Sequence, residues 1–430
     1  MTAIAAAGFF LLAVAAAGSA YFFFDARNRA ERNLVAAKQA IQNLDDFIWS
    51  ANQGAQSMAG ARLDKVQASL GQLQQSLDQL LSEDPNNLEL LAIRAGNFAN
   101  FVDAYLAARS IRDAQATAEE GLRTATRMAK LDANDTHTLK ARVMAFYKRA
   151  DVRRESRDLG GALEDCREAE RLAATLVGTT GQHPDALRLQ WVATEKLGEA
   201  LVATDDANAR ETLEKATALA RSLMAAFPTD PARRRDVALS LASEGREAET
   251  RNDPAAAVER FGESLQMFTE LVADHPSDPL FIRDEALAMM NFGLGKFSTG
   301  DQSGANSALG SALEIVRRKA NDDALNARAK HDLLAVLVAR ARINLDAEKA
   351  TARASLDEAL QVARAFMAID SGAAQNRYDL ATVEMRLALN FDDTNALADE
   401  AKQIVRGLDA DGLLTPADRA AFAKFEQLVR

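Results

Sequence analysis

A repeat with a period of 44 to 48 residues constrains this chain more than any other feature. Each copy has an alanine, a large apolar residue four positions later, and a small residue three positions after that. Six copies begin at Ala118, Ala162, Ala209, Ala257, Ala305 and Ala352. A fixed period of about 20 to 50 residues is the signature of a solenoid. The sequence therefore predicts a linear array of similar units, which favours binding over catalysis.

Each period contains two predicted helices. In one unit, Asp230 suits an N-cap and Pro231 the first helical position, and Asn252-Asp253-Pro254 repeats this signal for the second helix. On second helices, apolar or small residues recur at offsets 0, 3, 4 and 7, which is one face of an α-helix. First helices carry a recurring glycine, at Gly198, Gly245 and Gly293. Because glycine within a helix costs about 1 kcal/mol relative to alanine, its recurrence predicts a close approach of the partner helix.

The combination of Gly245 with Ala257, Phe261 and Ser264 resembles the tetratricopeptide-repeat family. The ordinary repeat has about 34 residues, and the extra length here corresponds to about four helical turns, two per helix. Long repeats of this kind look like the C-terminal arrays of bacterial signalling proteins. The resemblance covers roughly residues 85 to 390. It implies an all-α, right-handed helical solenoid of about six or seven helix pairs, and it leaves the bound molecule undefined.

The resemblance also implies a binding surface. Solenoids of this family bind in a concave groove, lined by the first helix of each pair. Transferring the groove-facing offsets onto this chain gives the predicted partner-binding residues Tyr147, Arg154, Glu195, Glu199, Arg246, Met290 and Phe297. The charges in this set are mixed. Met290 and Phe297 have a second interpretation, as core residues of a long helix.

The N-terminal segment carries no charge from Ala3 to Phe24. As a helix, it would span about 33 Å, enough to cross a hydrocarbon core of about 30 Å. Residues 1–24 are therefore predicted to be a transmembrane anchor. The basic residues after it place the array in the cytoplasm by the positive-inside rule, namely Arg27, Arg29, Arg32 and Lys38. The alternatives are a signal peptide cleaved near Gly18-Ser19-Ala20, with the array exported to the periplasm, and a buried core helix.

Three more segments follow the predicted anchor. Residues 25–60 are predicted to form a juxtamembrane helix, whose heptad-spaced apolar residues suit a short coiled coil or a first solenoid helix. Residues 61–392 form the repeat array. Residues 393–430 lack the alanine motif and are predicted to be capping helices, with Thr415-Pro416 at a helix start. The anchor and the juxtamembrane helix are the candidates for homo-oligomer formation.

The chain lacks a recognisable catalytic or metal-binding pattern. The four histidines have no partner at ligand spacing, and the sequence has no phosphate-binding glycine loop, HExxH motif or nucleophile elbow. Cys166 occupies the large apolar position of its repeat, which predicts a core residue. The net charge of −11 argues against a nucleic-acid partner. We therefore expect a non-enzyme without cofactor or metal.

A polar residue also recurs with the repeat. The aspartates are Asp236, Asp284, Asp332 and Asp379, and the residues before them are Arg235, Arg283, His331 and Tyr378. One interpretation is a ladder of ion pairs between repeats, in which each exposed pair would contribute only ~0–1 kcal/mol. The other is an acidic stripe that recognises a basic partner.

These observations predict a membrane-anchored, non-catalytic scaffold or adaptor that binds a protein or peptide in its concave groove. Two other functions use the same surface. One is a sensor module that controls a separately encoded enzyme. The other, for an exported array, is an envelope-assembly factor.

Overall fold

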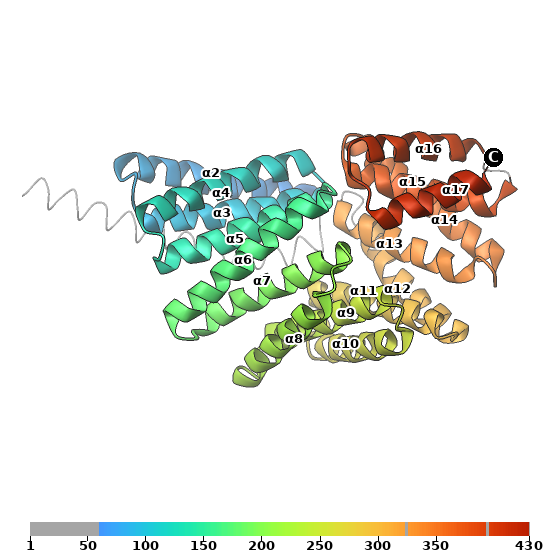
Figure 1. Ribbon diagram of the computed structural model, residues 1–430, viewed down its shortest axis with the longest axis horizontal. Coiled ribbons are helices and arrows are strands. Elements are labelled where there is room, and N and C mark those ends of the chain that lie inside the picture. The colour runs from blue at the N-terminus through green and yellow to red at the C-terminus, as the bar shows by residue number, and fades with distance from the viewer. Residues whose placement is uncertain (1–59, 323–325, 393–394, 430) are drawn as a thin grey trace, which may run out of the picture.

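The protein is an array of antiparallel helix pairs (Figure 1). This computed structural model describes residues 60–322, 326–392 and 395–429, within which every regular element is a helix. In each pair, helix A precedes helix B. The A helices are α3 (Leu88–Ala107), α5 (Thr136–Glu155), α7 (Pro184–Ala203), α9 (Pro231–Thr250), α11 (Pro279–Ser298), α13 (Ala327–Asn344) and α15 (Ala374–Asn390). The B helices are α4 (Ile111–Leu131), α6 (Leu159–Thr180), α8 (Ala209–Ala226), α10 (Pro254–Asp274), α12 (Gln302–Asp322), α14 (Lys349–Ile369) and α16 (Asn395–Ala410).

Two helices flank the seven pairs: α2 (Gly60–Glu83) and α17 (Pro416–Leu428). The expected helix starts are present. The Asp230 carboxylate accepts a hydrogen bond from the Ala232 amide (2.9 Å), and that of Asp253 accepts one from the Ala256 amide (3.1 Å). These side chains satisfy amides that the first helical turn leaves without partners. The prediction of six or seven helix pairs is confirmed, and the right-handed sense of the array stays a prediction.

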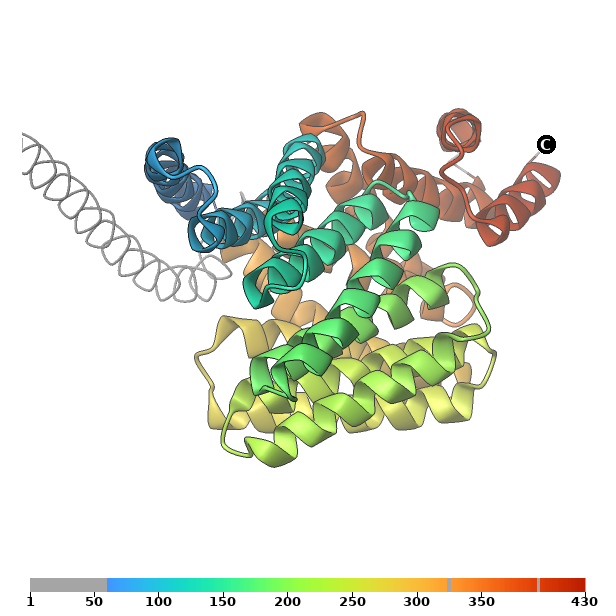
Figure 2. The ribbon, with the colours of Figure 1, turned by 60° about the vertical axis from the view of Figure 1, so that its left-hand side comes forward.

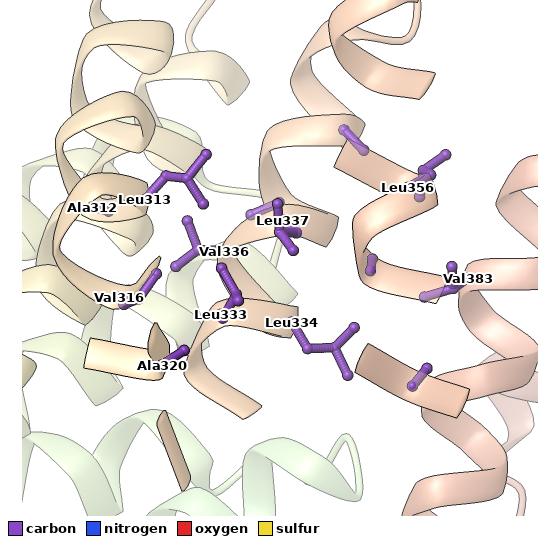
Figure 3. Close-up of a cluster of buried hydrophobic side chains, with 14 of the residues drawn as sticks. Ala312, Leu313, Val316, Ala320, Leu333, Leu334, Val336, Leu337, Leu356 and Val383 are labelled. Atoms are coloured by element: carbon purple, nitrogen blue, oxygen red, sulfur yellow. The ribbon is translucent and has the colours of Figure 1, made fainter. Parts of the chain in front are cut away.

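The recurring alanines and their partners form the core between helices A and B. All six motif alanines are buried, as are Cys166 and Phe261. Burial raises the pKa of the Cys166 thiol to about 12, in keeping with its predicted core position. The largest apolar cluster joins α12, α13, α14 and α15 (Figure 3).

The glycines of the A helices lie where helix B approaches closely. A methyl group added at Gly245 would lie 2.5 Å from the Phe261 ring, and one added at Gly293 would lie 3.0 Å from Leu309. A methyl group at Gly198 would collide with Leu213. The predicted close approach is therefore confirmed in three successive pairs.

The turn between helices A and B uses the left-handed backbone region. In five successive pairs, a residue with φ between 55° and 88° occupies this turn, namely Arg109, Arg157, Asp205, Asn252 and Gly300. Glycine, asparagine and aspartate tolerate this conformation, whereas arginine adopts it less readily. The two arginines therefore stand in positions that the local backbone alone does not favour.

The A helices form the inner layer of a curved array. Each of α3, α5, α7, α9 and α11 contacts the next A helix as well as its own partner helix. The chain curves from the first pairs through α7 to α12 and back, so that the last pairs lie beside the first (Figures 1 and 2). A curved stack of this kind gives an inner face made of A helices.

The structure contradicts the prediction of a single-pass membrane protein. Within the described ranges, no helix combines the length and the apolar character that crossing a bilayer requires, because the long helices carry charged residues. The predicted anchor at residues 3–24, and the juxtamembrane helix up to residue 59, lie outside the described residues. The described residues support neither membrane attachment nor self-association through these segments.

Candidate functional site: the inner face of the A helices

The first and last helix pairs are joined by Arg109. Its guanidinium donates a hydrogen bond of 2.6 Å to the Asn376 side chain and forms an ion pair of 3.2 Å with Asp379. The same group lies 4.7 Å from the centroid of the Phe366 ring. Only 5% of the Arg109 side chain is exposed. A buried arginine charge needs partners. Here α15 supplies two of them, and the Glu155 carboxylate of α5 lies 3.8 Å away as a third.

A second arginine makes the equivalent contact one pair later. The Arg157 guanidinium pairs with Asp418 (2.6 Å), donates to the Leu413 carbonyl (3.0 Å), and lies 3.6 Å from the centroid of the Tyr378 ring. The Tyr378 hydroxyl in turn donates to Asp418 (2.7 Å). Burial, together with this hydrogen bond, raises the pKa of Tyr378 to about 12. We call the contacts of Arg109 and Arg157 with α15, α17 and the turn before α17 the ring closure.

The recurring aspartates form a ladder of ion pairs between repeats. Arg235 of α9 pairs with Asp284 of α11 (2.6 Å), and Arg283 of α11 pairs with Asp332 of α13 (2.6 Å). The three carboxylates of Asp236, Asp284 and Asp332 are buried, and an acidic stripe needs exposed ones. The ladder interpretation is therefore confirmed. The expectation of exposed, weak pairs is corrected, because buried carboxylates depend more strongly on their partners.

The ladder ends where an arginine is missing. The residue before Asp332 is His331, and the position that would pair with Asp379 thus lacks a permanent charge. Arg109 from the first pair supplies that charge to Asp379. Burial raises the pKa of Asp379, and His331 and Arg109 oppose this shift. The ring closure therefore completes the ladder.

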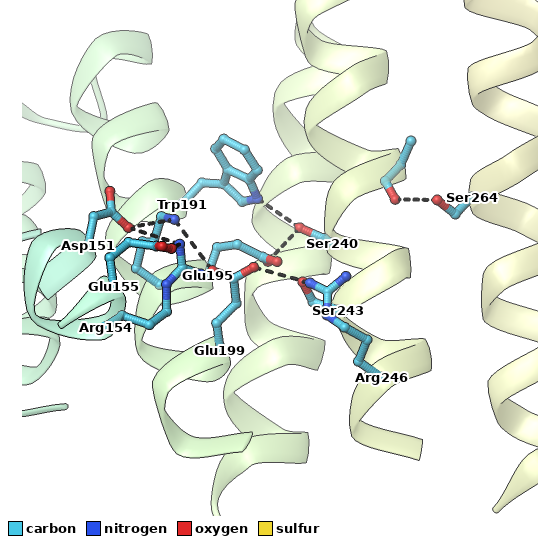
Figure 4. Close-up of polar contacts among 12 residues, drawn as sticks. Asp151, Arg154, Glu155, Trp191, Glu195, Glu199, Ser240, Ser243, Arg246 and Ser264 are labelled. Atoms are coloured by element: carbon cyan, nitrogen blue, oxygen red, sulfur yellow. Dashed lines mark hydrogen bonds and ion pairs between the residues drawn. The ribbon is translucent and has the colours of Figure 1, made fainter. Parts of the chain in front are cut away.

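A group of charged side chains crosses the inner face of α5, α7 and α9 (Figure 4). Lys196 pairs with Asp151 (2.9 Å) and Glu199 (3.4 Å), and Arg246 pairs with Glu199 (3.1 Å). Burial disfavours the Glu199 carboxylate, but Lys196, Arg154 and Arg246 outweigh it and lower the pKa of Glu199. We call this set the inner-face network: Asp151, Arg154, Lys196, Glu199 and Arg246.

Arg154 is the loosely held member of the network. Its guanidinium lies 3.7–3.9 Å from carboxylate oxygens of Asp151, Glu155 and Glu199. These distances exceed those of ordinary hydrogen bonds, so the acids hold the charge without fixing its N–H donors. The Arg154 side chain is 46% exposed. Its donors are therefore available to a partner molecule.

Glu195 lies beneath the network and is almost completely buried. The Trp191 indole donates to the Ser240 hydroxyl (2.9 Å), which donates to the Glu195 carboxylate (2.8 Å). Burial, together with the charge of Glu199, raises the pKa of Glu195 to about 7. With 7% of its surface exposed, Glu195 supports the network from below rather than contacting a partner.

The seven predicted binding residues thus separate into two groups. Arg154, Glu199 and Arg246 are joined by ion pairs, with Glu195 behind them. Tyr147 is half-buried, packs against the core of the second and third pairs, and has the Lys148 ammonium 5.3 Å from its ring. Met290 and Phe297 are also half-buried and pack against the large apolar cluster, as their core interpretation expects. The assignment of all seven to partner binding stays a prediction.

Sequence reasoning missed several functional candidates. Asp151 and Lys196 belong to the network and lie one helical turn or less from predicted members. Lys148 pairs with Asp103 of α3 and extends the charged surface towards the first pair. The sequence did contain a signal for the ring closure. Arg109 and Arg157 occupy turn positions at which later repeats have aspartate, asparagine or glycine.

The inner face presents charge from helices that are distant in the chain. The pKa of Glu249 in α9 is raised by burial, and Arg342 of α13 and Arg246 oppose the shift. In the part of the chain that the structure describes, no group of three His, Cys, Asp or Glu side chains is arranged to hold a metal ion.

These features define a helical-repeat array with a tetratricopeptide-like fold. The structure is similar to that of a Rap protein complexed with competence and sporulation factor, with a TM-score of 0.50 and 10% sequence identity, covering 91% of this chain and 99% of that chain. It is also similar to NprR in complex with its cognate peptide NprX, with a TM-score of 0.41 and 13% identity, over 85% of this chain and 97% of that one. A third similar structure is that of a tetratricopeptide repeat protein from Parabacteroides merdae. The TM-score is 0.38 and the sequence identity is 13%, over 81% of this chain and 98% of that chain.

The resemblance that the repeat motif indicated is therefore confirmed at the level of the fold. No protein-family model and no curated protein matches the chain. At these identities the likeness concerns the fold alone and assigns no function.

Proposed function

We propose that this chain is a non-catalytic binding module that holds a protein or peptide partner on the inner face of its A helices. The main support for this proposal is Arg154. Its side chain is half-exposed, and its guanidinium lies beyond hydrogen-bond distance from all three neighbouring carboxylates. A partner carboxylate that approaches Arg154 would gain a charge-assisted hydrogen bond without breaking a short one. The proposed partner therefore presents an acidic side chain or a C-terminal carboxylate.

The neighbouring residues support the same assignment. Arg246 is 42% exposed, and Lys196 and Glu199 are partly exposed beside it. Such mixed charges confer orientation as well as affinity, because like charges placed opposite each other are costly. The Rap protein of similar fold was crystallised with a bound factor, which is a precedent for ligand binding by an array of this architecture.

The test is a comparison of captured partners between matched variants. Full-length wild-type protein, Arg154→Ala and Arg246→Ala are immobilised and exposed to lysate, and bound proteins and peptides are quantified by mass spectrometry. The control is Arg406→Ala on α16, which removes an exposed arginine paired with Glu426. We expect a stoichiometric partner that wild type and the control retain, and whose binding Arg154→Ala weakens by about 2 kcal/mol, the size of an interface hot spot.

Identical capture by all four proteins would place the binding surface elsewhere. Melting temperatures provide the second readout, since removing a half-exposed side chain should leave stability unchanged. A variant that loses its partner and also unfolds early does not support the assignment.

The ring closure favours a second candidate function, that of a sensor. In an open solenoid each repeat contacts only its neighbours, whereas here Arg109 and Arg157 join the two ends. A ligand on the inner face would alter the spacing of the A helices and hence the closure. A scaffold keeps the same closure with and without its partner, and small-angle scattering of both states separates the two functions.

A further inference from the structure

A cavity lies beneath α17, away from the inner-face network. Its volume is about 580 Å³, within the range of roughly 300–1,000 Å³ found for small-molecule sites. Helices α15, α16 and α17 form its walls, and Leu345 after α13 lies at one edge. The apolar side chains of the lining include Met385, Leu389, Leu414, Phe422, Phe425 and Leu428.

The cavity wall is held in place although α17 is the last described helix. Thr415 caps α17 in a reciprocal arrangement with Asp418, and Asp418 pairs with Arg157 of the second repeat. On the apolar face of α17, Phe425 is buried, whereas Leu428 is 64% exposed. Leu389 of α15 is 40% exposed across the cavity. The apolar faces of α15 and α17 are thus incompletely covered by the described protein.

The charges of the lining favour an anion. Arg386 and Lys424 both line the cavity, and neither has an ion-pair partner among the described residues. The single acid of the lining, Asp418, already pairs with Arg157 and accepts a hydrogen bond from Tyr378. Burial and the neighbouring Arg342 lower the pKa of Arg386, which means that its positive charge is not compensated. A carboxylate beside Arg386 would supply that compensation.

We propose that this cavity binds a small apolar carboxylate of the medium-chain fatty-acid class. The alkyl chain lies among Met385, Leu414 and Phe422, and the carboxylate lies at Arg386 with Lys424 nearby. The cavity shares no residue with the inner-face network. A test of ligand binding in the cavity is therefore independent of the proposed partner binding.

Decanoate is the first probe, titrated calorimetrically into the full-length protein. We expect one molecule to bind per chain. The uncharged 1-decanol should bind at least about tenfold more weakly, because its hydroxyl cannot form an ion pair with Arg386. Equal binding of the alcohol overturns the anion preference, and no binding of decanoate up to millimolar concentration overturns the site.

Two variants locate the binding in the cavity. Ala421→Trp fills the space from α17 and should abolish decanoate binding. The matched control is Ala420→Trp, one residue earlier, which is exposed as Ala421 is but does not line the cavity. Arg386→Met keeps an unbranched side chain and removes its charge, and it should weaken decanoate binding about tenfold or more while leaving 1-decanol binding unchanged.

Circular dichroism and melting curves establish that each variant folds. Undiminished decanoate binding by Ala421→Trp places the ligand elsewhere and overturns the proposal. An equal loss in Ala420→Trp and Ala421→Trp also overturns it, since a perturbed helix then explains both. If Ala421→Trp fails to fold, Arg386→Met decides, because only cavity binding predicts its selective effect on the carboxylate.

Discussion

Arg109 and Asn376 are joined by a hydrogen bond of 2.6 Å, although 267 residues separate them in the chain. With the pair of Arg157 and Asp418, 261 residues apart, this bond closes the array on itself. A repeat protein otherwise approximates a one-dimensional stack, in which distant repeats do not influence each other. The ring closure adds a direct coupling between the first two and the last repeats, and it makes the shape of the inner face depend on both ends.

Removing Arg157 should weaken the ring closure without disturbing the repeat that carries it, since only the Arg109 contacts then remain. Asparagine tolerates the left-handed turn better than arginine, so Arg157→Asn keeps the turn and removes the guanidinium. We expect a larger radius of gyration by small-angle X-ray scattering and an earlier melting step for the last repeat. Arg406→Asn, at an exposed pair on α16, is the control. An unchanged scattering curve would show that the Arg157 contacts do not determine the shape.

The ion-pair ladder should be sensitive to the loss of one partner and tolerant of the loss of both. Arg283→Met leaves the Asp332 carboxylate, which is 7% exposed, without its cation. We expect a cost of about 2–3 kcal/mol in urea unfolding, somewhat below the 3–5 kcal/mol of fully buried pairs because Arg283 is partly exposed. The double variant Arg283→Met with Asp332→Leu should recover most of this loss. Additive costs would mean that the two side chains do not interact.

Replacing the recurring glycine of helix A, even by alanine, should destabilise the protein. Gly245→Ala places a methyl group 2.5 Å from the Phe261 ring, and the helices must separate to admit it. We expect a destabilisation of about 1–3 kcal/mol, typical of overpacking. Gly310→Ala in α12 is the control, since its added methyl group meets nothing within 4 Å. That change should stabilise the protein by up to about 1 kcal/mol through helix propensity. Chemical denaturation of both variants measures the contrast, and destabilisation by both would contradict the steric explanation.

Buried Glu384 should make stability depend on pH. Burial and the neighbouring Glu400 carboxyl raise the pKa of Glu384 from 4.5 to about 8, and the side chain is fully covered. The folded state therefore holds this proton more tightly than the unfolded state between pH 4.5 and about 8. Its contribution is complete below pH 4.5 and is lost as the pH rises through about 8.

The test is Glu384→Gln, which keeps the neutral shape at every pH. Relative to wild type, it should gain about 2–4 kcal/mol in unfolding free energy at pH 9 and almost nothing at pH 5. Glu426→Gln, which alters a pair on the surface, should show no such pH dependence. Equal gains at pH 5 and pH 9 would exclude titration of Glu384 as the cause.

The candidate site could be predicted only in part. Arg154, Glu199 and Arg246 followed from the register of the repeat, because each A helix presents the same offsets to the inner face. Met290 and Phe297 have the same offsets but pack against the apolar cluster, since long side chains on these helices also reach the neighbouring core. The cavity beneath α17 left no periodic signal, because it arises where the repeat ends.

The sequence by itself determined the helix pairs, their boundaries and their buried faces. These depend on local and periodic chemistry: proline and aspartate at helix starts, glycine opposite Phe261, and small residues every 44 to 48 positions. Only the tertiary structure decided how far the array curves and what its ends contact. Curvature is the sum of small rotations between repeats, which no single residue specifies, and Arg109 meets Asp379 only after that sum brings them together.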